Sequence, residues 1–252
     1  MIRTLNGSVI QSSERKLQSR ADRRDAFLEA TRQLIEERGI DSLTVKAVAD
    51  RVDAAVGTLY TYFPSKGALI AALQVEAIGQ LDAAYTRAAD HLDLDLAARG
   101  TDVETAAVAR LVAFGRSLIA VADVLPEAFR LQQRLLHDRA DYDDHDLALV
   151  VPAAFAVLAR PERLLRDAVA LGLIDEGDAF DRTIAWVAGI NGVLTLGALT
   201  WSGNEGFALA SLADTLHLSL LRGWGARPGL LAAADVLVPL GHMGVLLGAD
   251  SR

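Results

Sequence analysis

Residues 43–70, which read LTVKAVADRVDAAVGTLYTYFPSKGALI, constrain the fold of this chain more than any other segment. Two stretches with apolar residues at helical spacing are separated there by a turn of only Asp53 and Ala54. So short a connection forces a sharp change of direction. The segment therefore predicts two short helices held at a tight turn.

Local residues set the bounds of these helices. Thr44 can cap the first helix, because its hydroxyl can accept from a free backbone N–H of the first turn. The second helix is predicted from about residue 55 to residue 63, where Pro64 ends it. Ser65 can cap the next helix, which runs from Lys66 towards His91 and is long enough to connect two bodies.

A longer helix is predicted before this segment, from Ala21 to Arg38, with Gly39 at the position of a helix C-cap. Its apolar residues recur at helical spacing and would face the second short helix, whose own inner face carries Leu59 and Phe63. Three helices braced in this way form a helix-turn-helix unit.

The rest of the chain shows repeated helical periodicity and no strand alternation, which predicts an all-α fold. The expected helices cover residues 102–122, 126–138, 143–159, 161–173, 178–200 and 207–223. Pro126, Pro161 and Asp178 stand at their predicted starts. Residues 227–252 form either an extra helix or a trailing tail.

Charge is distributed unevenly along the chain. Residues 1–75 hold 11 basic and 9 acidic residues, whereas the remainder holds 14 basic and 24 acidic residues. The net charge of −8 argues against a general polyanion binder. The first part has a slight excess of basic residues and the second a large excess of acidic residues, so the two parts differ in charge. Residues 1–20 are polar and without periodicity, which predicts a disordered basic arm that either contacts phosphate or only solubilises the chain.

The chain has no cysteine, which excludes disulfides and thiolate metal sites and fits a reducing compartment. Its N-terminus lacks the apolar stretch of a secretory signal, so we expect a cytoplasmic protein. The apolar passages 188–201 and 229–248 are too short or too interrupted for a membrane span, and we expect buried helices there and no membrane partner.

The run from Leu43 to Ile70 closely resembles the DNA-binding segment of the TetR (tetracycline repressor-like) family of bacterial transcriptional regulators, with matching order and spacing from Phe27 to Leu73. The portion GTLY followed by F-PSK-x-x-L is highly specific. The resemblance implies a DNA-binding head, residues 21–66, and a helical ligand-binding and dimerisation domain, residues 67–226. It implies a homodimeric repressor or activator that binds a palindromic operator in double-stranded DNA and responds to a small effector.

In that family the second short helix is the recognition helix, so its exposed residues would contact DNA. Gly57 would permit close approach, and the Tyr60 hydroxyl would reach phosphate. Tyr62 would offer either its hydroxyl to phosphate or its ring to a thymine methyl. Lys66, at a helix N-terminus, would bind a phosphate together with free N–H groups. The full candidate set is Arg20, Arg23, Arg24, Thr44, Val56, Gly57, Thr58, Tyr60, Thr61, Tyr62 and Lys66.

Three residues depart from the common pattern of the family, which has Gly at Asp53, Ser at Ala55 and Glu at Gly67. Asp53 can adopt the left-handed turn geometry of glycine at some cost. Ala55 cannot cap the recognition helix, so that helix either starts earlier with Asp53 as cap or frays.

The larger domain carries no recognisable motif, and its site residues are chosen by residue type. Helix faces with small residues or leucines suit a four-helix interface across a twofold axis, or alternatively the core of a single chain. The residues chosen for the interface are Gly189, Gly192, Leu209, Leu212, Leu216 and Leu220. An apolar cavity for a hydrophobic effector could be lined by Leu111, Phe114, Leu118, Phe129, Leu135, Phe155, Leu158, Trp186 and Asn191. Arg116 and Gln132 are further polar candidates for orienting a ligand.

Catalysis is not expected, because the chain lacks a glycine-rich phosphate loop after a strand, a nucleophile elbow and a cysteine nucleophile. We expect no cofactor. The run HDRADYDDHD, residues 137–146, could supply metal ligands but more simply forms a solvated loop in which Asp143 and Asp144 favour a helix start. The alternatives to a regulator are an enzyme, or an architectural DNA-binding protein, with a similar head.

Overall fold

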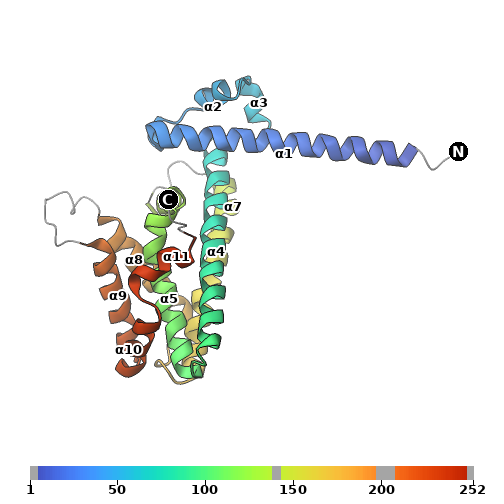
Figure 1. Ribbon diagram of the computed structural model, residues 1–252. Helices are drawn as coiled ribbons and strands as arrows, with labels where there is room; N and C mark the ends of the chain where they lie inside the picture. The colour runs from blue at the N-terminus through green and yellow to red at the C-terminus, as the bar shows by residue number, and fades with distance from the viewer. Residues whose placement is uncertain (1–4, 138–142, 197–207, 249–252) are drawn as a thin grey trace. The chain divides into compact units, whose positions relative to one another are not determined.

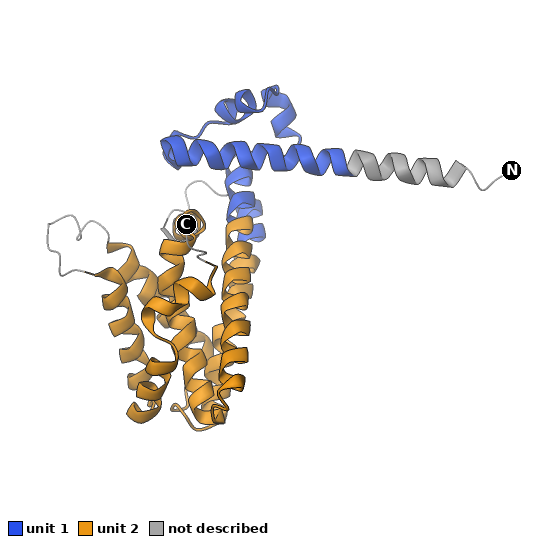
Figure 2. Cartoon of the chain, viewed as in Figure 1, with its two compact units in different colours: residues 1–74, 139–150 blue, residues 75–138, 151–252 orange. Residues whose placement is uncertain are grey.

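The computed structural model of the chain describes residues 5–137, 143–196 and 208–248. Every regular element in these ranges is a helix, which confirms the predicted all-α class. The chain divides into two compact units, residues 1–74 with 139–150 and residues 75–138 with 151–252 (Figure 2). The division falls inside helix α4 (Lys66–Ala98), eight residues after the boundary expected between residues 66 and 67.

The first unit contains α1 (Leu5–Arg38), the short 3₁₀ helix η1 (Ile40–Ser42), α2 (Val45–Arg51), α3 (Val56–Tyr60) and the start of α4. The first residues of α7 (Asp144–Ala170) also belong to it. Figure 1 shows α2 and α3 along one side of α1. Phe27, Val48, Leu59 and Leu69 are fully buried between these helices, so each contributes to one small apolar core.

Helix α1 begins far earlier than expected, at Leu5 instead of Ala21, so the segment predicted as a disordered arm is helical from residue 5. The reason is that starting a helix is unfavourable whereas extending one is not. The packed part of α1 supplies the nucleus, and residues 5–20 contain no proline that would stop its extension.

The predicted caps of the short helices are confirmed. The Thr44 hydroxyl accepts a hydrogen bond from the backbone N–H of Ala47 at 3.1 Å. The Ser65 hydroxyl accepts one from Ala68 at 2.8 Å at the start of α4. Gly39 follows α1 with a φ of 77°, the left-handed conformation that glycine adopts without strain.

The second unit is built around α5 (Val103–Val124). Contacts reach α5 from α6 (Pro126–His137), α8 (Ala179–Leu194), α9 (Leu209–Gly223), α10 (Pro228–Leu237) and α11 (Met243–Leu246), the last preceded by η3 (Leu240–His242). Neighbours on several sides leave α5 with most of its residues buried, including the polar Arg116 and Ser117. A helix that is apolar on nearly every side is the expected centre of such a bundle.

The predicted break at Pro161 is wrong, because α7 continues through both Pro152 and Pro161. A proline inside a helix removes one backbone hydrogen bond. Pro161 is buried and lies one turn before the fully buried Leu165, so packing of this part of α7 offsets the lost bond. The helix expected over residues 178–200 ends at Leu194, and its last predicted residues, 197–200, lie outside the described part of the chain.

Residues 227–248 form an extra helical segment, the first of the two alternatives. Among the described residues, two stretches have the length and apolar composition of a membrane span, α5 and residues 228–246. Helix α5 is mainly buried inside the second unit. The other stretch is divided into α10, η3 and α11 and is mostly exposed. The expectation of a buried helix therefore holds only for one face, which carries Leu231, Ala234 and Met243.

Several polar residues are packed into the core of the second unit, and Arg116 and His217 are the largest of them. Arg116 of α5 forms a two-bond ion pair with Asp214 of α9, with both N–O distances 2.9 Å. It also pairs with Asp235 of α10 at 2.5 Å and donates to the carbonyl of Val238. Burial alone would lower the pKa of the guanidinium, but the hydrogen bonds of the two carboxylates raise it. Arg116 therefore joins three helices and does not face a ligand.

His217 of α9 is fully buried, and its Nδ1 accepts a hydrogen bond from the indole N–H of Trp186 at 2.9 Å. Its ring occupies the space beside Gly115, where a Cβ atom would lie 2.4 Å from the imidazole. Burial is the main reason that the pKa of His217 is lowered to about 4. The imidazole is therefore neutral at physiological pH and acts as a packing and hydrogen-bonding group.

Candidate DNA-binding surface and effector cavity

The turn between α2 and α3 depends on Asp53, which has a φ of 50°. Short polar side chains such as Asp tolerate this left-handed conformation better than most residues, as expected for a position where glycine would be unstrained. The backbone N–H of Ala54 then bonds the carbonyl of Ala49 at 2.9 Å. Ala55 is the N-cap residue of α3 and provides no side-chain bond, so the alternative of an earlier start capped by Asp53 does not hold.

Helix α3 buries one residue and exposes most of the others. Leu59 is fully buried, whereas Gly57, Tyr60 and Thr61 are exposed and Thr58 is half-buried. A Cβ atom added at Gly57 would meet no atom within 4 Å. Packing inside the chain therefore does not require glycine at this position, and the bare backbone is open to a partner.

Tyr62 and Phe63 follow α3, and each ring makes a cation–π contact with an arginine of α1. The guanidinium of Arg20 lies 5.8 Å from the centre of the Tyr62 ring, and that of Arg24 lies 5.3 Å from the centre of Phe63. Tyr62 also packs against Phe27, with ring centres 5.6 Å apart. Tyr62 thus packs against the core and is also half-exposed. The two arginines that contact these rings lie on helix α1 and not on a disordered arm.

The orientation of α2 against α1 is held by a two-bond ion pair. Arg51 donates to the carboxylate of Glu37 at 2.7 and 2.9 Å and to Gln33 at 3.3 Å. Hydrogen bonding to Arg51 is the main reason that the pKa of Glu37 is lowered. This exposed pair fixes the register of α2 on the head more than it adds stability.

One cation of the head was not among the predicted contacts. Lys46 is exposed in the first turn of α2, two residues after Thr44. All three lysines of the chain, Lys16, Lys46 and Lys66, lie in its first 66 residues. That restriction is the sequence pattern that could have identified Lys46 as a candidate phosphate contact.

A cavity of about 140 Å³ lies in the second unit. Helices α4, α5, α6, α7 and α8 contribute its wall, which is mainly apolar. The residues are Ile78, Leu81, Tyr85, Phe114, Leu118, Gln132, Ala154, Val157, Leu158, Ile184, Val187, Ala188 and Asn191. The cavity thus combines a few amide and hydroxyl groups with an apolar wall, which is the usual composition of a small-molecule site.

Two polar groups of this wall are well defined. The Asn191 side chain is buried, accepts from Gln133 at 2.6 Å and donates to the Val187 carbonyl at 2.9 Å. The Tyr85 hydroxyl is buried and has no hydrogen-bond partner among the described residues. Burial raises the pKa of that hydroxyl, so it stays protonated and can donate to a bound molecule.

A family model described as bacterial regulatory proteins, tetR family, matches residues 27–73, from the packed part of α1 to the beginning of α4. This match covers residues 27–73 alone and shows a tetR-type head. The transcriptional repressor KstR of Mycolicibacterium smegmatis is 38% identical over 84 residues, which are 33% of this chain and 41% of KstR. KstR of Mycobacterium tuberculosis is 38% identical over 82 residues, 32% of this chain and 37% of that protein. The match spans less than half the length of these relatives.

Solved structures resemble this chain over most of its length. A Rhodococcus sp. RHA1 protein of unknown function has a TM-score of 0.59 and 22% identity, covering 80% of this chain and 94% of the other. RolR in complex with resorcinol has a TM-score of 0.55 and 18% identity, covering 88% of this chain and 95% of RolR. At these identities the likeness concerns the fold.

Four of the nine predicted pocket residues line the cavity, namely Phe114, Leu118, Leu158 and Asn191. Gln132, weighed as a polar candidate, lines it as well. The structure contradicts the prediction for four others, because Leu111, Phe129 and Trp186 are buried core residues and Phe155 is 50% exposed. Phe155 stacks on Phe180 at the surface. The Leu135 side chain lies outside the described residues.

The predicted interface residues lie on α8 and α9, and two of them, Gly189 and Leu216, approach each other within the chain. A Cβ atom at Gly189 would lie 3.1 Å from Leu216, so these two helices approach closely at that glycine. Ala213, His217 and Leu221 form the buried face of α9, whereas Leu209, Leu212, Leu216 and Leu220 form a stripe beside it that is exposed or half-buried. Gly192 is exposed.

The histidine and aspartate run at residues 137–146 is described only in part, since residues 138–142 lie outside the described ranges. At its end α7 begins at Asp144, one residue after the start predicted for this helix. Asp143 accepts from the backbone N–H of Asp146 at 2.8 Å, and burial raises the pKa of the Asp146 carboxyl. These aspartates therefore organise a helix start.

Proposed function

We propose that this chain is a homodimeric, ligand-responsive transcriptional repressor that binds a palindromic operator. The observation that carries this proposal is the exposed face of α3, where Gly57, Thr58, Tyr60 and Thr61 follow a tight turn within the segment matched by the tetR family model. Small and hydroxyl-bearing side chains allow a helix to enter the major groove closely and to contact base edges and phosphates.

Cations around this face support binding of the DNA backbone. Arg20, Lys46 and Lys66 lie on three different helices of the first unit, and Arg20 and Lys46 are exposed. Lys66 stands in the first turn of α4, whose free N–H groups also favour a phosphate. We assign these residues to phosphate contacts, which supply affinity, and the α3 residues to sequence reading.

We propose the 140 Å³ cavity as the effector site. An engineered apolar cavity of about 150 Å³ is known to hold benzene, so a compact, mainly hydrophobic molecule of about one ring matches this volume. RolR, which shares the fold, was solved with the single-ring molecule resorcinol. Asn191 and the Tyr85 hydroxyl would orient the polar groups of the effector.

The outer stripe of α9, together with exposed residues of α8, is proposed as the dimer interface. Two copies of this pair of helices would form a four-helix bundle across a twofold axis. The two recognition helices would then meet half-sites about one helical turn apart. Effector binding would shift the population between two head spacings, which requires different effector affinities in the two states. The protein would work in the cytoplasm, on the nucleoid when bound to DNA.

The test is selection of fragmented genomic DNA of the source organism on the purified full chain at moderate salt, followed by sequencing. Enrichment of a few promoters that share a palindrome is expected. The Tyr62→Phe variant keeps the ring that packs on Phe27 and removes only the hydroxyl. We expect it to fold like the parent and to bind the operator more weakly. Recovery of fragments without a shared motif would favour an architectural protein and would refute sequence-specific repression.

A further inference from the structure

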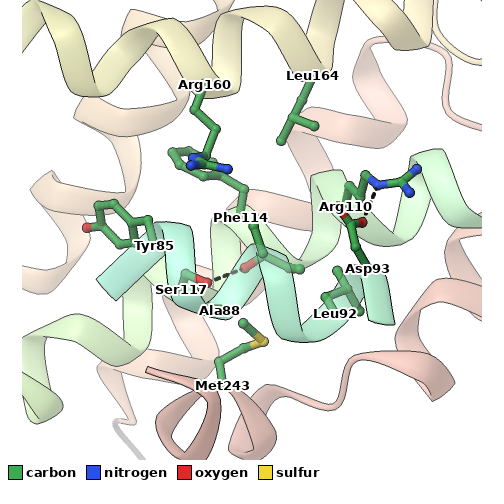
Figure 3. Close-up of a pocket in the computed structure, with 12 residues that line it drawn as sticks. Tyr85, Ala88, Leu92, Asp93, Arg110, Phe114, Ser117, Arg160, Leu164 and Met243 are labelled. Carbon is green, nitrogen blue, oxygen red and sulfur yellow. Dashed lines mark hydrogen bonds and ion pairs between the residues drawn. The ribbon is translucent and has the colours of Figure 1, made fainter. Parts of the chain in front are cut away.

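A second cavity, of about 80 Å³, lies in the second unit and shares only Tyr85 and Phe114 with the effector cavity described above. Figure 3 shows its wall: Arg160 and Leu164 of α7 on one side, and Met243 of α11 on the opposite side. Ala88 and Leu92 of α4 and Phe114 of α5 complete most of the apolar surface. The C-terminal segment thus closes a pocket that α4, α5 and α7 leave open.

Two arginines line this cavity, and their surroundings differ. Arg110 forms an ion pair with Asp93, with Nε 2.7 Å from the carboxylate, so its charge is already neutralised. Arg160 donates from one terminal nitrogen to the Thr86 hydroxyl at 2.7 Å. Among the described residues no carboxylate lies within ion-pair distance of Arg160, and its Nε is buried without a hydrogen-bond partner.

An unpaired guanidinium with a buried free donor beside apolar walls is costly unless something completes its hydrogen bonds. Arg116 shows how this chain pairs a buried arginine, with two aspartates and a carbonyl. Arg160 lacks such partners within the described residues. A carboxylate fits best, because its two oxygens match the planar fork of a guanidinium.

We propose that the cavity around Arg160 binds the carboxylate group of a small aliphatic acid, with Arg160 as the anion-binding residue. The cavity is partly open, so an acid of about three to five carbons can place its carboxylate and nearest carbons inside the 80 Å³ and leave the end of its chain towards the opening. The chain would lie against Leu92, Leu164 and Met243, and the carboxylate would meet the Nε of Arg160.

This second site is connected to the effector cavity by two shared rings. Tyr85 and Phe114 line both cavities, and their ring centres are 5.8 Å apart. In Figure 3 the Tyr85 hydroxyl points away from Arg110 and Asp93. A molecule in the second cavity therefore contacts the partition that bounds the effector site. An effect of the bound acid on the effector site rests on the proposed function, whereas binding of the acid itself does not.

The experiment measures binding of pentanoate and of 1-pentanol to the full chain without DNA, by ligand-observed NMR titration at pH 7.5. The two probes have the same chain length and differ in charge. The parent protein is expected to bind pentanoate more tightly than 1-pentanol. Arg160→Gln should weaken pentanoate binding by about tenfold or more and change 1-pentanol binding by less than about twofold.

Arg110→Gln is the matched control, because it makes the same substitution at the paired arginine of the same cavity. It should leave pentanoate binding within about threefold of the parent. Arg160→Lys keeps the positive charge and should retain part of the preference for pentanoate, which covers the case in which Arg160→Gln fails to fold. Circular dichroism checks folding of each variant.

Three outcomes would overturn the proposal: no pentanoate binding by the parent, equal losses in the two glutamine variants, or unchanged binding in Arg160→Gln. Because DNA is absent from the titration, a head that binds no operator would not alter any of these readings. Operator binding is measured separately, so failure of the repressor proposal and failure of the carboxylate site are distinguished.

Discussion

Acid should destabilise the second unit through one residue, His217. Its imidazole is fully buried beside Gly115, and its Nδ1 accepts from Trp186 and therefore carries no proton. Burial is the largest influence on its pKa, followed by Asp214, which raises the pKa, and Arg116, which lowers it. The result is a folded-state pKa of about 4 against 6.5 for the free side chain.

Because the folded-state pKa is lowered, the unfolded chain binds the proton more readily. The stabilisation by neutral His217 is therefore complete above about pH 6.5 and is lost as pH falls towards 4. The difference corresponds to roughly 3 kcal/mol over the whole range, of which roughly 2 kcal/mol is already lost at pH 5. Most carboxylates titrate below this window, so histidine dominates between pH 7 and 5.

Urea unfolding between pH 7.5 and 5, followed by tryptophan fluorescence at one protein concentration, measures this loss. Trp186 and Trp224 both belong to the second unit, so the fluorescence reports its unfolding. His217→Gln retains an acceptor for the Trp186 N–H but does not titrate, and it should lose much less stability over this range. His242→Gln, at an exposed histidine, should behave like the parent. An equal loss in His217→Gln would refute the reasoning.

Three further substitutions test the head and the core. Gly57→Ala should stabilise α3 by up to about 1 kcal/mol in thermal unfolding, because the added methyl group meets no atom of the chain. The same variant should weaken operator binding in an anisotropy titration. Unchanged affinity would contradict close approach of DNA. Gly115→Ala should destabilise the second unit by about 2 kcal/mol or more in urea, since its Cβ would overlap the His217 ring. Arg116→Leu should cost about 3 kcal/mol by leaving the half-buried Asp214 without its cation, and adding Asp214→Leu should restore part of the loss; an additive double variant would speak against this pairing.

The structure of the head could be predicted closely because short-range chemistry specifies it. Thr44 and Ser65 satisfy backbone N–H groups three residues away, and Pro64 ends a helix through its own ring. The turn at Asp53 likewise depends on the backbone preferences of one residue. These interactions involve neighbours in the sequence, so a single chain contains the information needed to place them.

Tertiary structure decided the features in which distant faces meet. An aromatic side chain is equally suited to a core, a cavity wall or an exposed stack, and only packing assigned Trp186 to the core, Phe114 to a cavity and Phe155 to the surface. The continuation of α7 through Pro161 depends on burial that the local sequence does not reveal. Packing also decides whether an arginine has a carboxylate partner among the described residues, as Arg116 has and Arg160 has not. Interactions between neighbours in the sequence are enough to specify a tetR-type head on an all-α chain. The cavities and the buried charges depend instead on which helices pack together, and many interactions distant in sequence determine that packing.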